Sequence, residues 1–173
     1  MNIRLALESD IVSINEIYNQ SILTGYSTCD TEPIPISERV EWFKNHNPKT
    51  HPILVADIDG IIVGWISLSE YRPGRSALAQ TVEVSYFIDK NFQNKGIGSQ
   101  LMDRIIKEAK EIGHKNVFAI LLENNERSIA LLKNFEFKQW AHLPEVAVLN
   151  GSKVGQVYYG LTIKFYTFID ETY

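Results

Sequence analysis

The sequence has few of the residues that would suggest an extracellular, metal-binding or membrane protein. It has one cysteine in 173 residues, Cys29, which excludes an internal disulfide and a cysteine-based zinc cluster and suggests a reducing compartment. No signal-like apolar segment follows Met1, and no apolar run approaches the roughly 20 residues of a membrane span. The four histidines lack the spacing of metal ligands. We therefore expect a cytoplasmic protein with no bound metal and no membrane partner.

The sequence also lacks a basic excess. Lys and Arg number 17 against 21 Asp and Glu, which gives a formal net charge of -4. Because proteins that bind nucleic acids usually carry a positive face, a nucleic-acid partner is not expected. Lys and Arg nevertheless outnumber Asp and Glu by two between residues 89 and 115, so the negative charge is concentrated elsewhere.

The order of hydrophobic patterns predicts one α/β domain. Hydrophobic residues make up 45% of the chain, which is enough for a core, and no linker or repeat divides it. Helical spacing predicts helices from Ile11 to near Gly25, from a Ser37 cap to before Pro48, and over 98–112 and 125–133. Strands are predicted over 3–7, 53–58, 61–68, 81–88, 117–122, 137–149 and 154–163. We expect a mixed sheet with helices on both faces, a single domain over residues 1–163, and a C-terminal strand extension or tail over 164–173.

The segment from Phe92 to Ser99 favours anion binding. It lies between a predicted strand and helix and contains Gly96 and Gly98, which allow a tight turn whose amides point at a ligand. The positive end of the helix and nearby Lys90 and Lys95 would attract a pyrophosphate. A Walker loop is absent, and a dinucleotide fingerprint would need a third glycine where Leu101 stands. An ordinary strand-to-helix turn remains the alternative.

Glu83 is the candidate catalytic residue because it lies in the middle of an otherwise apolar and aromatic strand. A carboxylate in that position is unusual unless it is paired or functional. A functional carboxylate in that position suits a general base, which accepts a proton from a reacting group. The alternatives are that Glu83 faces solvent or pairs with an arginine.

The pattern Gln93-x-x-Gly96-x-Gly98 between a strand and an amphipathic helix resembles motif A of the GNAT acetyltransferase superfamily. Further segments, in order along the chain, resemble the branch of phosphinothricin and methionine sulfone N-acetyltransferases. They are Ile3-Arg4, Ile17-Tyr18-Asn19, residues 27–33, Arg39, Trp42-Phe43, Val63-Gly64, Ser67-Leu68, Tyr71-Arg72-Pro73, Thr81-Val82-Glu83 and Asn125-x-x-Ser128-Ile129-x-Leu131. The resemblance covers residues 3–163.

This resemblance implies a GNAT-like fold, with a mostly antiparallel twisted sheet of about seven strands and about four flanking helices. It implies acetyl-CoA as co-substrate and Glu83 as general base. The residues implied in acetyl-CoA binding are Tyr86, Phe87, Ile88, Gln93, Asn94, Lys95, Gly96, Ile97, Gly98, Ser99, Asn125 and Ser128. A homodimer is also implied, because the family often forms one.

The acceptor side departs from the family pattern. Leu132 stands where a His or Tyr often lies near the sulfur, so acid assistance would come from Tyr158, Tyr159 or solvent. Leu78 and Ala79 replace a tyrosine and a basic residue of the branch. Loop residues expected to flank the acceptor are Tyr26, Thr28, Arg72 and Arg75. Either of these arginines could hold an acceptor carboxylate or be solvated surface.

The favoured function is direct acetyl transfer from acetyl-CoA to the primary amine of a small molecule, such as an amino acid or its analogue. One alternative is the same chemistry on a protein N-terminus, a lysine, a polyamine or an aminoglycoside. The other is a non-catalytic sensor of acyl-CoA, which the absence of a donor at Leu132 supports.

Overall fold

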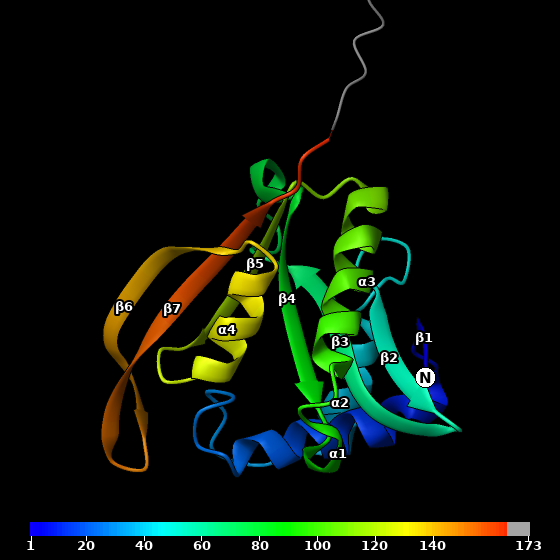
Figure 1. Ribbon diagram of the computed structural model, residues 1–173, viewed down its shortest axis with the longest axis horizontal. Helices are drawn as coiled ribbons and strands as arrows, with labels where there is room; N and C mark the ends of the chain where they lie inside the picture. Colours follow the sequence, from blue (N-terminus) through cyan, green and yellow to red (C-terminus); the bar gives the residue numbers. More distant parts are fainter. Residues whose placement is uncertain (166–173) are drawn as a thin grey trace, which may run out of the picture.

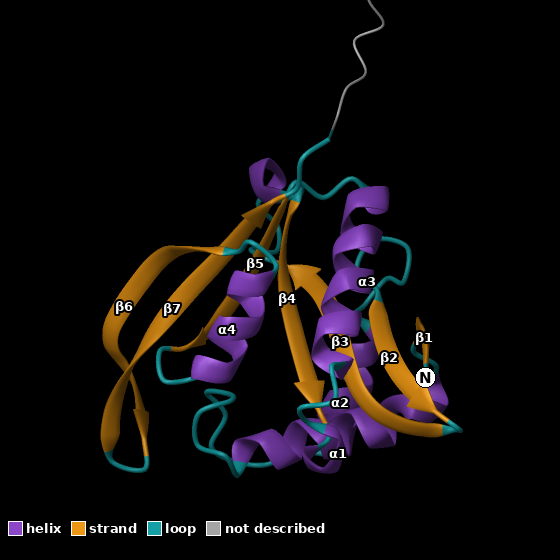
Figure 2. Cartoon of the chain, in the orientation of Figure 1, coloured by secondary structure: helices purple, strands orange, loops and turns teal. Residues whose placement is uncertain are grey.

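Seven strands form one twisted sheet with helices on both faces (Figures 1 and 2). A computed structural model describes residues 1–165 of the chain. The strands are β1 (Asn2–Leu5), β2 (Ile53–Ile58), β3 (Ile61–Glu70), β4 (Thr81–Ile88), β5 (Asn116–Leu122), β6 (Lys138–Leu149) and β7 (Ser152–Thr162). The helices are α1 (Ile11–Ile22), α2 (Ile36–Lys44), α3 (Ile97–Ile112) and α4 (Glu126–Asn134). Short 3-10 turns lie at Glu8–Asp10, Ser76–Leu78 and Lys90–Phe92.

The strand order is β1-β2-β3-β4-β5-β7-β6, with β4 and β5 parallel and the other neighbours antiparallel. The predicted fold class, a mixed and mostly antiparallel sheet of seven strands, is therefore confirmed. The parallel pair arises because α3 carries the chain back from the end of β4 to the start of β5, as parallel strands require.

The sheet separates two apolar clusters. On one face, α3 and α4 contribute side chains such as Leu101, Ile105 and Leu132 to the larger cluster. On the other face, Ile14 and Ile17 of α1 pack against β2 and Trp65 of β3, with Trp42 and Phe43 of α2 beside them. Figure 1 shows α3 and α4 on either side of β4, while α1 runs crosswise near the C-terminal end of that strand.

Alternation along β4 assigns its side chains to these two faces. Val82 and Val84 belong to the α3–α4 cluster, with Tyr86 and Ile88 packed against it. Phe87 packs in the α1–α2 cluster, and Glu83 lies two strand positions from Ser85 and four from Phe87. Because successive side chains of a strand point to opposite faces, Glu83 and Ser85 share the face of Phe87.

β4 and β5 diverge halfway along their length. They pair only at residues 81–83 of β4 and 116–118 of β5, the last pair being Glu83 with Phe118. Beyond it, β4 stays paired with β3 as far as Ile88, and β5 stays paired with β7 as far as Leu122. The facing edges of β4 and β5 are therefore open from Glu83 onward, which leaves backbone donors and acceptors available to a ligand.

Turns and caps follow the sequence closely, with one exception. Asp59 (φ 53°) and Gly60 (φ 86°) form the predicted two-residue hairpin turn, and Gly113 (φ 99°) ends α3 in the left-handed conformation. Ser37 was expected to cap α2, but that expectation is wrong. The helix begins at Ile36 with Pro35 as its N-cap, at φ -61° and ψ 146°, because the proline ring fixes φ at a value that leads directly into a helix.

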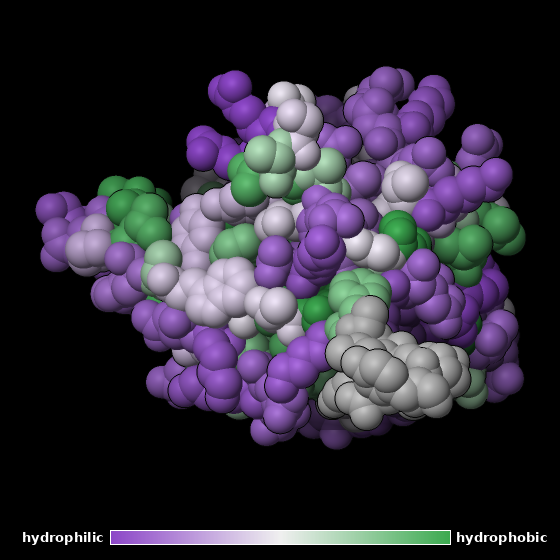
Figure 3. Space-filling model, turned by 90° about the horizontal axis from the view of Figure 1, so that it is seen from above, coloured by the Kyte–Doolittle hydropathy of each residue, from purple (hydrophilic) through white to green (hydrophobic). Residues whose placement is uncertain are grey.

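The C-terminal hairpin and the surface leave some expectations open. Trp140 and Val148 of β6 are exposed, but the expected homodimer stays a prediction. β7 ends at Thr162, and the strand extension or tail expected over 164–173 lies mostly in residues 166–173, outside the described residues. On the face in Figure 3, hydrophobic residues form small groups among hydrophilic ones. Within residues 1–165, no helix is both long and apolar enough to cross a membrane.

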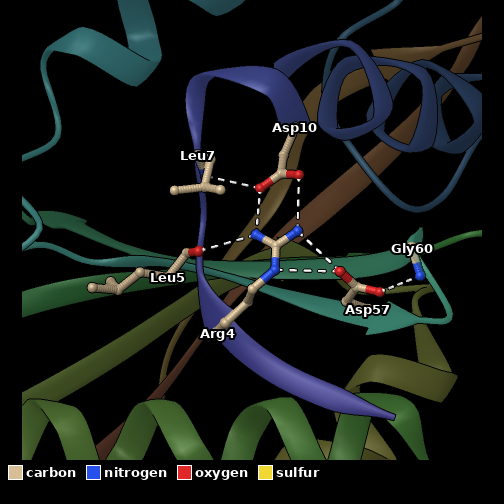
Figure 4. Close-up of polar contacts among 6 residues, drawn as sticks. All are labelled: Arg4, Leu5, Leu7, Asp10, Asp57 and Gly60. Atoms are coloured by element: carbon tan, nitrogen blue, oxygen red, sulfur yellow. Dashed lines mark hydrogen bonds and ion pairs between the residues drawn. The ribbon is translucent and has the colours of Figure 1, made fainter.

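An ion-pair network holds β1 against the start of α1 and the β2–β3 turn (Figure 4). Arg4 Nη1 lies 2.6 Å from Asp10 Oδ2 and Nη2 lies 3.0 Å from Asp57 Oδ2, while the Leu7 amide donates to Asp10 at 2.8 Å. Burial alone would raise the pKa of Asp10, but hydrogen bonds from Arg4 and Leu7 outweigh it and hold that pKa below its usual value. The pair therefore stabilises the fold only while Asp10 is ionised.

Replacing Asp10 with asparagine should lower the free energy of unfolding by about 1–3 kcal/mol at pH 7, because Arg4 loses its charged partner. A lowered folded-state pKa gives stability above the unfolded pKa of about 3.9, and this stability disappears as pH falls through the folded pKa. Urea unfolding at pH 7 and pH 3 should thus show a gap between wild type and variant that shrinks in acid. Asp103→Asn, which removes an exposed pair with Lys107, is the control and should cost under about 0.5 kcal/mol. An equal gap at both pH values would contradict this account.

Candidate active site

Two cavities meet where β4 and β5 diverge. The first, named the α3 cavity, opens at the start of α3 and is lined by Gln20, Ser21, Thr24, Tyr26, Ser27, Tyr86, Phe87, Ile88, Lys90, Phe92, Gln93, Asn94, Gly96, Ile97, Gly98, Ser99, Asn125, Arg127, Ser128 and Leu131. The second, named the Glu83 cavity, is lined by Tyr18, Ser27, Thr28, Cys29, Asp30, Ile34, Glu38, Arg39, Trp42, Trp65, Ser67, Glu83, Ser85, Phe87, Ile120, Leu121, Leu122 and Gln156. Ser27 and Phe87 line both, so the two cavities are neighbours.

The loop before α3 has the geometry of an anion cradle. Asn94 (φ 60°) and Gly96 (φ 75°) are both left-handed, and Gly96 is the N-cap of α3. The first amides of a helix have no intrahelical acceptor, and here those of Ile97, Gly98 and Ser99 lie at the cavity wall. A Cβ added at Gly98 would lie 3.4 Å from the Leu131 side chain, so Gly98 lies close to α4.

Hydrogen bonds fix this loop to its neighbours. Gln93 Nε2 donates to the carbonyl of Ile88 at 3.3 Å, and Arg127 Nη1 donates to Gln93 Oε1 at 2.6 Å. Gln93 thus joins the end of β4 to α4. These two hydrogen bonds restrain the loop before α3.

The charge of the α3 cavity is positive. Lys90 and Arg127 line it, and no Asp or Glu of the described chain does. Lys95 lies outside the lining, with its Nζ 4.8 Å from the centre of the Phe92 ring. This local balance agrees with the positive segment found in the sequence and fits a polyphosphate group.

Asn125 and Ser128 shape the far wall of the α3 cavity. Asn125 is buried and caps α4, accepting a hydrogen bond from the Ser128 amide at 3.2 Å. The cap holds the first turn of α4 facing the loop before α3.

Glu83 is half-buried in the second cavity, at the last paired position of β4 and β5. Burial raises the pKa of its carboxyl group above the ordinary value. Within residues 1–165 it has neither a hydrogen-bond nor an ion-pair partner, so the alternative of a structural pair with an arginine finds no support. An unpartnered carboxylate with a raised pKa at a cavity wall has the properties of a general base.

The rest of the Glu83 cavity combines acidic groups with aromatic walls. Asp30 and Glu38 add negative charge to that of Glu83, and Arg39 is the cationic side chain in this lining. Tyr18, Trp42, Trp65 and Phe87 supply the aromatic surface. The excess of carboxylates suits a cationic ammonium group.

The structure brings together most of the predicted site residues. All predicted acetyl-CoA residues except Lys95 line the α3 cavity, and Thr28 lines the Glu83 cavity. Tyr26 lies on the α3 cavity instead of the acceptor side. Arg72 and Arg75 are exposed in the loop after β3 and line neither cavity, because that loop turns away beyond the end of the strand. The expected contact of these arginines with an acceptor carboxylate finds no support in this geometry.

The candidate acids named from sequence lie elsewhere. Leu132 is fully buried in the core, and Tyr158 and Tyr159 line neither cavity. Tyr86 does line the α3 cavity, where burial raises the pKa of its hydroxyl to about 12. Its hydroxyl lies 3.5 Å from the carbonyl of Ser128, so it remains a protonated wall residue.

Tyr18, Arg39 and Trp42 form one wall of the Glu83 cavity. The sequence suggested only core or pocket wall for Trp42, and it assigned no site role to Tyr18 or Arg39, although both lie in segments that resemble the family branch. Arg39 is buried, and its position within a short amphipathic helix does not by itself distinguish it from a solvated arginine. Cys29 lines the same cavity, but burial raises its thiol pKa, which disfavours the nucleophilic thiolate.

The sequence profile of the acetyltransferase (GNAT) family matches residues 14–137. The chain belongs to this family. A Bacillus subtilis relative, YwnH, carries a provisional phosphinothricin acetyltransferase name. It is 34% identical over 154 residues, and the match covers 88% of this chain and 93% of the relative. A Salmonella typhimurium L-methionine sulfoximine/L-methionine sulfone acetyltransferase is 30% identical over 151 residues, and the match covers 87% of this chain and 88% of the relative. The structure of the Salmonella typhimurium acetyltransferase yncA with acetyl-CoA superposes with a TM-score of 0.90 at 27% identity, covering 99% of each chain.

These similarities confirm the family, the branch and the type of reaction inferred from sequence. The chain is an acetyl-CoA-dependent N-acetyltransferase. The residues of the α3 cavity fit the diphosphate and pantetheine portions of that donor, because they offer free amides, two cations and an open strand edge.

Replacing Gly96 with alanine should weaken acetyl-CoA binding about tenfold, because relief of the strained positive φ rotates the amides of the cradle. Gly74 is a matched control. It has the same φ of 75° and equally open space for a Cβ, but it lies in the loop after β3. Both alanine variants should lose similar thermal stability, while only Gly96→Ala changes the dissociation constant measured by calorimetry. Equal affinities in the two variants would remove Gly96 from the acetyl-CoA site.

Proposed function

We propose that this acetyltransferase acts on the primary amine of a small molecule, an amino acid or its analogue, with Glu83 as general base. The observation that carries the proposal is the position of Glu83. This unpartnered carboxylate with a raised pKa lines the Glu83 cavity where the β4–β5 pairing ends, on the same strand as Phe87, which lines both cavities. A base at that point can reach an amine that approaches from one cavity toward a thioester held in the other.

The chemistry of the α3 cavity supports its assignment to the donor. The amides of residues 94–99, at the positive end of α3, bind the pyrophosphate, with Lys90 and Arg127 near it. The open edge of β4 at Tyr86, Phe87 and Ile88 pairs with the amide-containing pantetheine arm, as an added strand would. Asn125 and Ser128 close the opposite side.

Acetyl-CoA supplies a thioester carbon that the amine nitrogen attacks. Glu83 accepts one proton from the acceptor ammonium group, which produces the nucleophilic free amine. A backbone amide on the open edge of β4 donates to the carbonyl oxygen as negative charge develops there. The carbon–nitrogen bond forms and the carbon–sulfur bond breaks. The nitrogen then releases its second proton to solvent and the thiolate takes a proton from solvent, since no acidic side chain is needed for this leaving group.

The acceptor class is supported by the relatives and by the cavity. The Salmonella relative is named for methionine sulfoximine and methionine sulfone, which are both α-amino acids. The Glu83 cavity offers carboxylates for an ammonium group and aromatic walls for an apolar side chain.

A second candidate acceptor is a polyamine, favoured by Asp30 and Glu38 in the wall of the same cavity. Carboxylates on several sides of a cavity would suit a molecule with several ammonium groups. The buried Arg39 in that wall is unfavourable for such a polycation, and the two candidates are separated by assaying both classes of amine.

Replacing Glu83 with glutamine should lower kcat at least about 100-fold, because the amide cannot accept the proton. The dissociation constant of acetyl-CoA should stay the same, since Glu83 lies outside the α3 cavity. In the wild type, activity should fall as pH drops through the raised pKa of Glu83, and the variant should lose that dependence. The measurement is thiol release with L-methionine sulfone as acceptor, across pH 5 to pH 9.

Glu70→Gln is the matched control, because this glutamate lies exposed at the end of β3 and lines neither cavity. It should keep wild-type turnover and pH dependence. Unchanged turnover in Glu83→Gln would remove Glu83 from the role of base. Wild-type binding of acetyl-CoA with no transfer to any amine would instead favour a sensor.

A further inference from the structure

We propose that Arg39 and Ser67 form a subsite for the acceptor's carboxylate, so that the enzyme selects amines with a carboxylate on the adjacent carbon. This subsite rests on the proposed function. It would make Arg39 and Ser67, which the sequence did not connect with the acceptor, responsible for the enzyme's choice of acceptor.

Arg39 is held rigidly in an aromatic box. It is 5% exposed, and its guanidinium carbon lies 4.5 Å from the centre of the Tyr18 ring and 4.7 Å from that of Trp42. Nε donates to Asn15 Oδ1 at 3.3 Å, which fixes the orientation of the guanidinium plane. Stacking on aromatic faces compensates part of the lost hydration of the cation.

The box supplies no anionic partner. Among residues 1–165, no carboxylate forms an ion pair with Arg39, and its terminal nitrogens have no hydrogen-bond acceptor. Asp30 influences Arg39 only through space, and its carboxylate accepts a hydrogen bond from the Tyr18 hydroxyl. A buried guanidinium whose N–H donors have no acceptors is energetically unfavourable unless a ligand accepts their hydrogen bonds. A carboxylate suits this position because its two oxygens can accept two parallel hydrogen bonds from the guanidinium.

Ser67 is a second unused donor in the same cavity. It is 1% exposed in the middle of β3, and its Oγ has no hydrogen-bond partner in the described chain. Its neighbour Trp65 is the third ring near Arg39, at 5.8 Å. Two unpartnered donors, one of them charged, therefore line one cavity, which points to an anionic ligand.

The register places this subsite at a suitable separation from Glu83. Ser67 pairs with Ser85 across β3 and β4, and Glu83 lies two residues from Ser85 on the same face. Ser67 is therefore about 7 Å along the strands and about 5 Å across them from Glu83, a diagonal of about 8–9 Å. In an α-amino acid the nitrogen and the carboxylate carbon are about 2.5 Å apart. Adding a hydrogen bond of about 2.8 Å at each end spans that separation. An amino acid can thus present its amine to Glu83 and its carboxylate to the Arg39 side.

The test compares L-methionine sulfone with its α-carboxamide as acceptors, by kcat/KM for thiol release at saturating acetyl-CoA. Wild type should favour the acid about 100-fold. Arg39→Gln should reduce this preference to within about threefold, chiefly through a higher KM for the acid. Arg39→Lys keeps the positive charge but loses the planar pair of N–H donors. This variant and Ser67→Ala should each reduce the preference for the acid about tenfold. The ratio isolates carboxylate recognition, because a purely structural defect would lower the use of both acceptors alike.

Arg72→Gln and Arg75→Gln are the matched controls, since these exposed arginines line neither cavity, and both should keep the wild-type preference. Equal use of acid and amide by wild type overturns the inference alone. Absence of transfer to any amine overturns the proposed function and the inference with it. If Arg39→Gln shows no thermal shift with acetyl-CoA, it has not folded, and the other two variants decide. An unchanged preference in both Arg39→Lys and Ser67→Ala overturns the subsite.

Discussion

The divergence of β4 from β5 after Glu83 is the constraint on which the rest of the site depends. Three paired residues hold the two strands together, and each strand then follows its other neighbour, β3 or β7. An open edge therefore results in the middle of the sheet. An open edge inside a protein exposes unpaired backbone groups, so it is stable chiefly when a ligand or side chains cover it. The two cavities lie beside this opening, and Ser27 and Phe87 line both of them.

The two cavities are neighbours, but their linings carry opposite charge. The α3 cavity has cations and free amides, while the Glu83 cavity has three carboxylates and one buried guanidinium. The net charge of -4 does not reveal this division, because the linings of the two cavities carry charges of opposite sign. The division fits a reaction between a polyanionic donor and a cationic acceptor, whose reacting groups meet where β4 and β5 separate.

The sequence predicted the parts of the site that are local in the chain. The cradle before α3, the hairpin at Asp59-Gly60 and the position of Glu83 within β4 depend on contiguous residues whose conformations are strongly restricted. The acceptor side was predicted less well, because it is assembled from α1, α2, β3 and β5. Arg72 and Arg75 were reasonable candidates from their place near β4 in sequence, yet the loop carries them away from the cavity. Arg39 is far from Glu83 in sequence, and only the packing of α2 on β3 brings it to the same cavity.

The central claim is that the open edge of β4 and the first amides of α3 hold acetyl-CoA. Hydrogen–deuterium exchange of the full chain, with and without acetyl-CoA, tests it most directly because it reports on those amides themselves. The account predicts that acetyl-CoA slows exchange at residues 84–88 and 94–99 and leaves the β6–β7 hairpin unchanged. Protection confined to other elements, or none at residues 84–88, would contradict it.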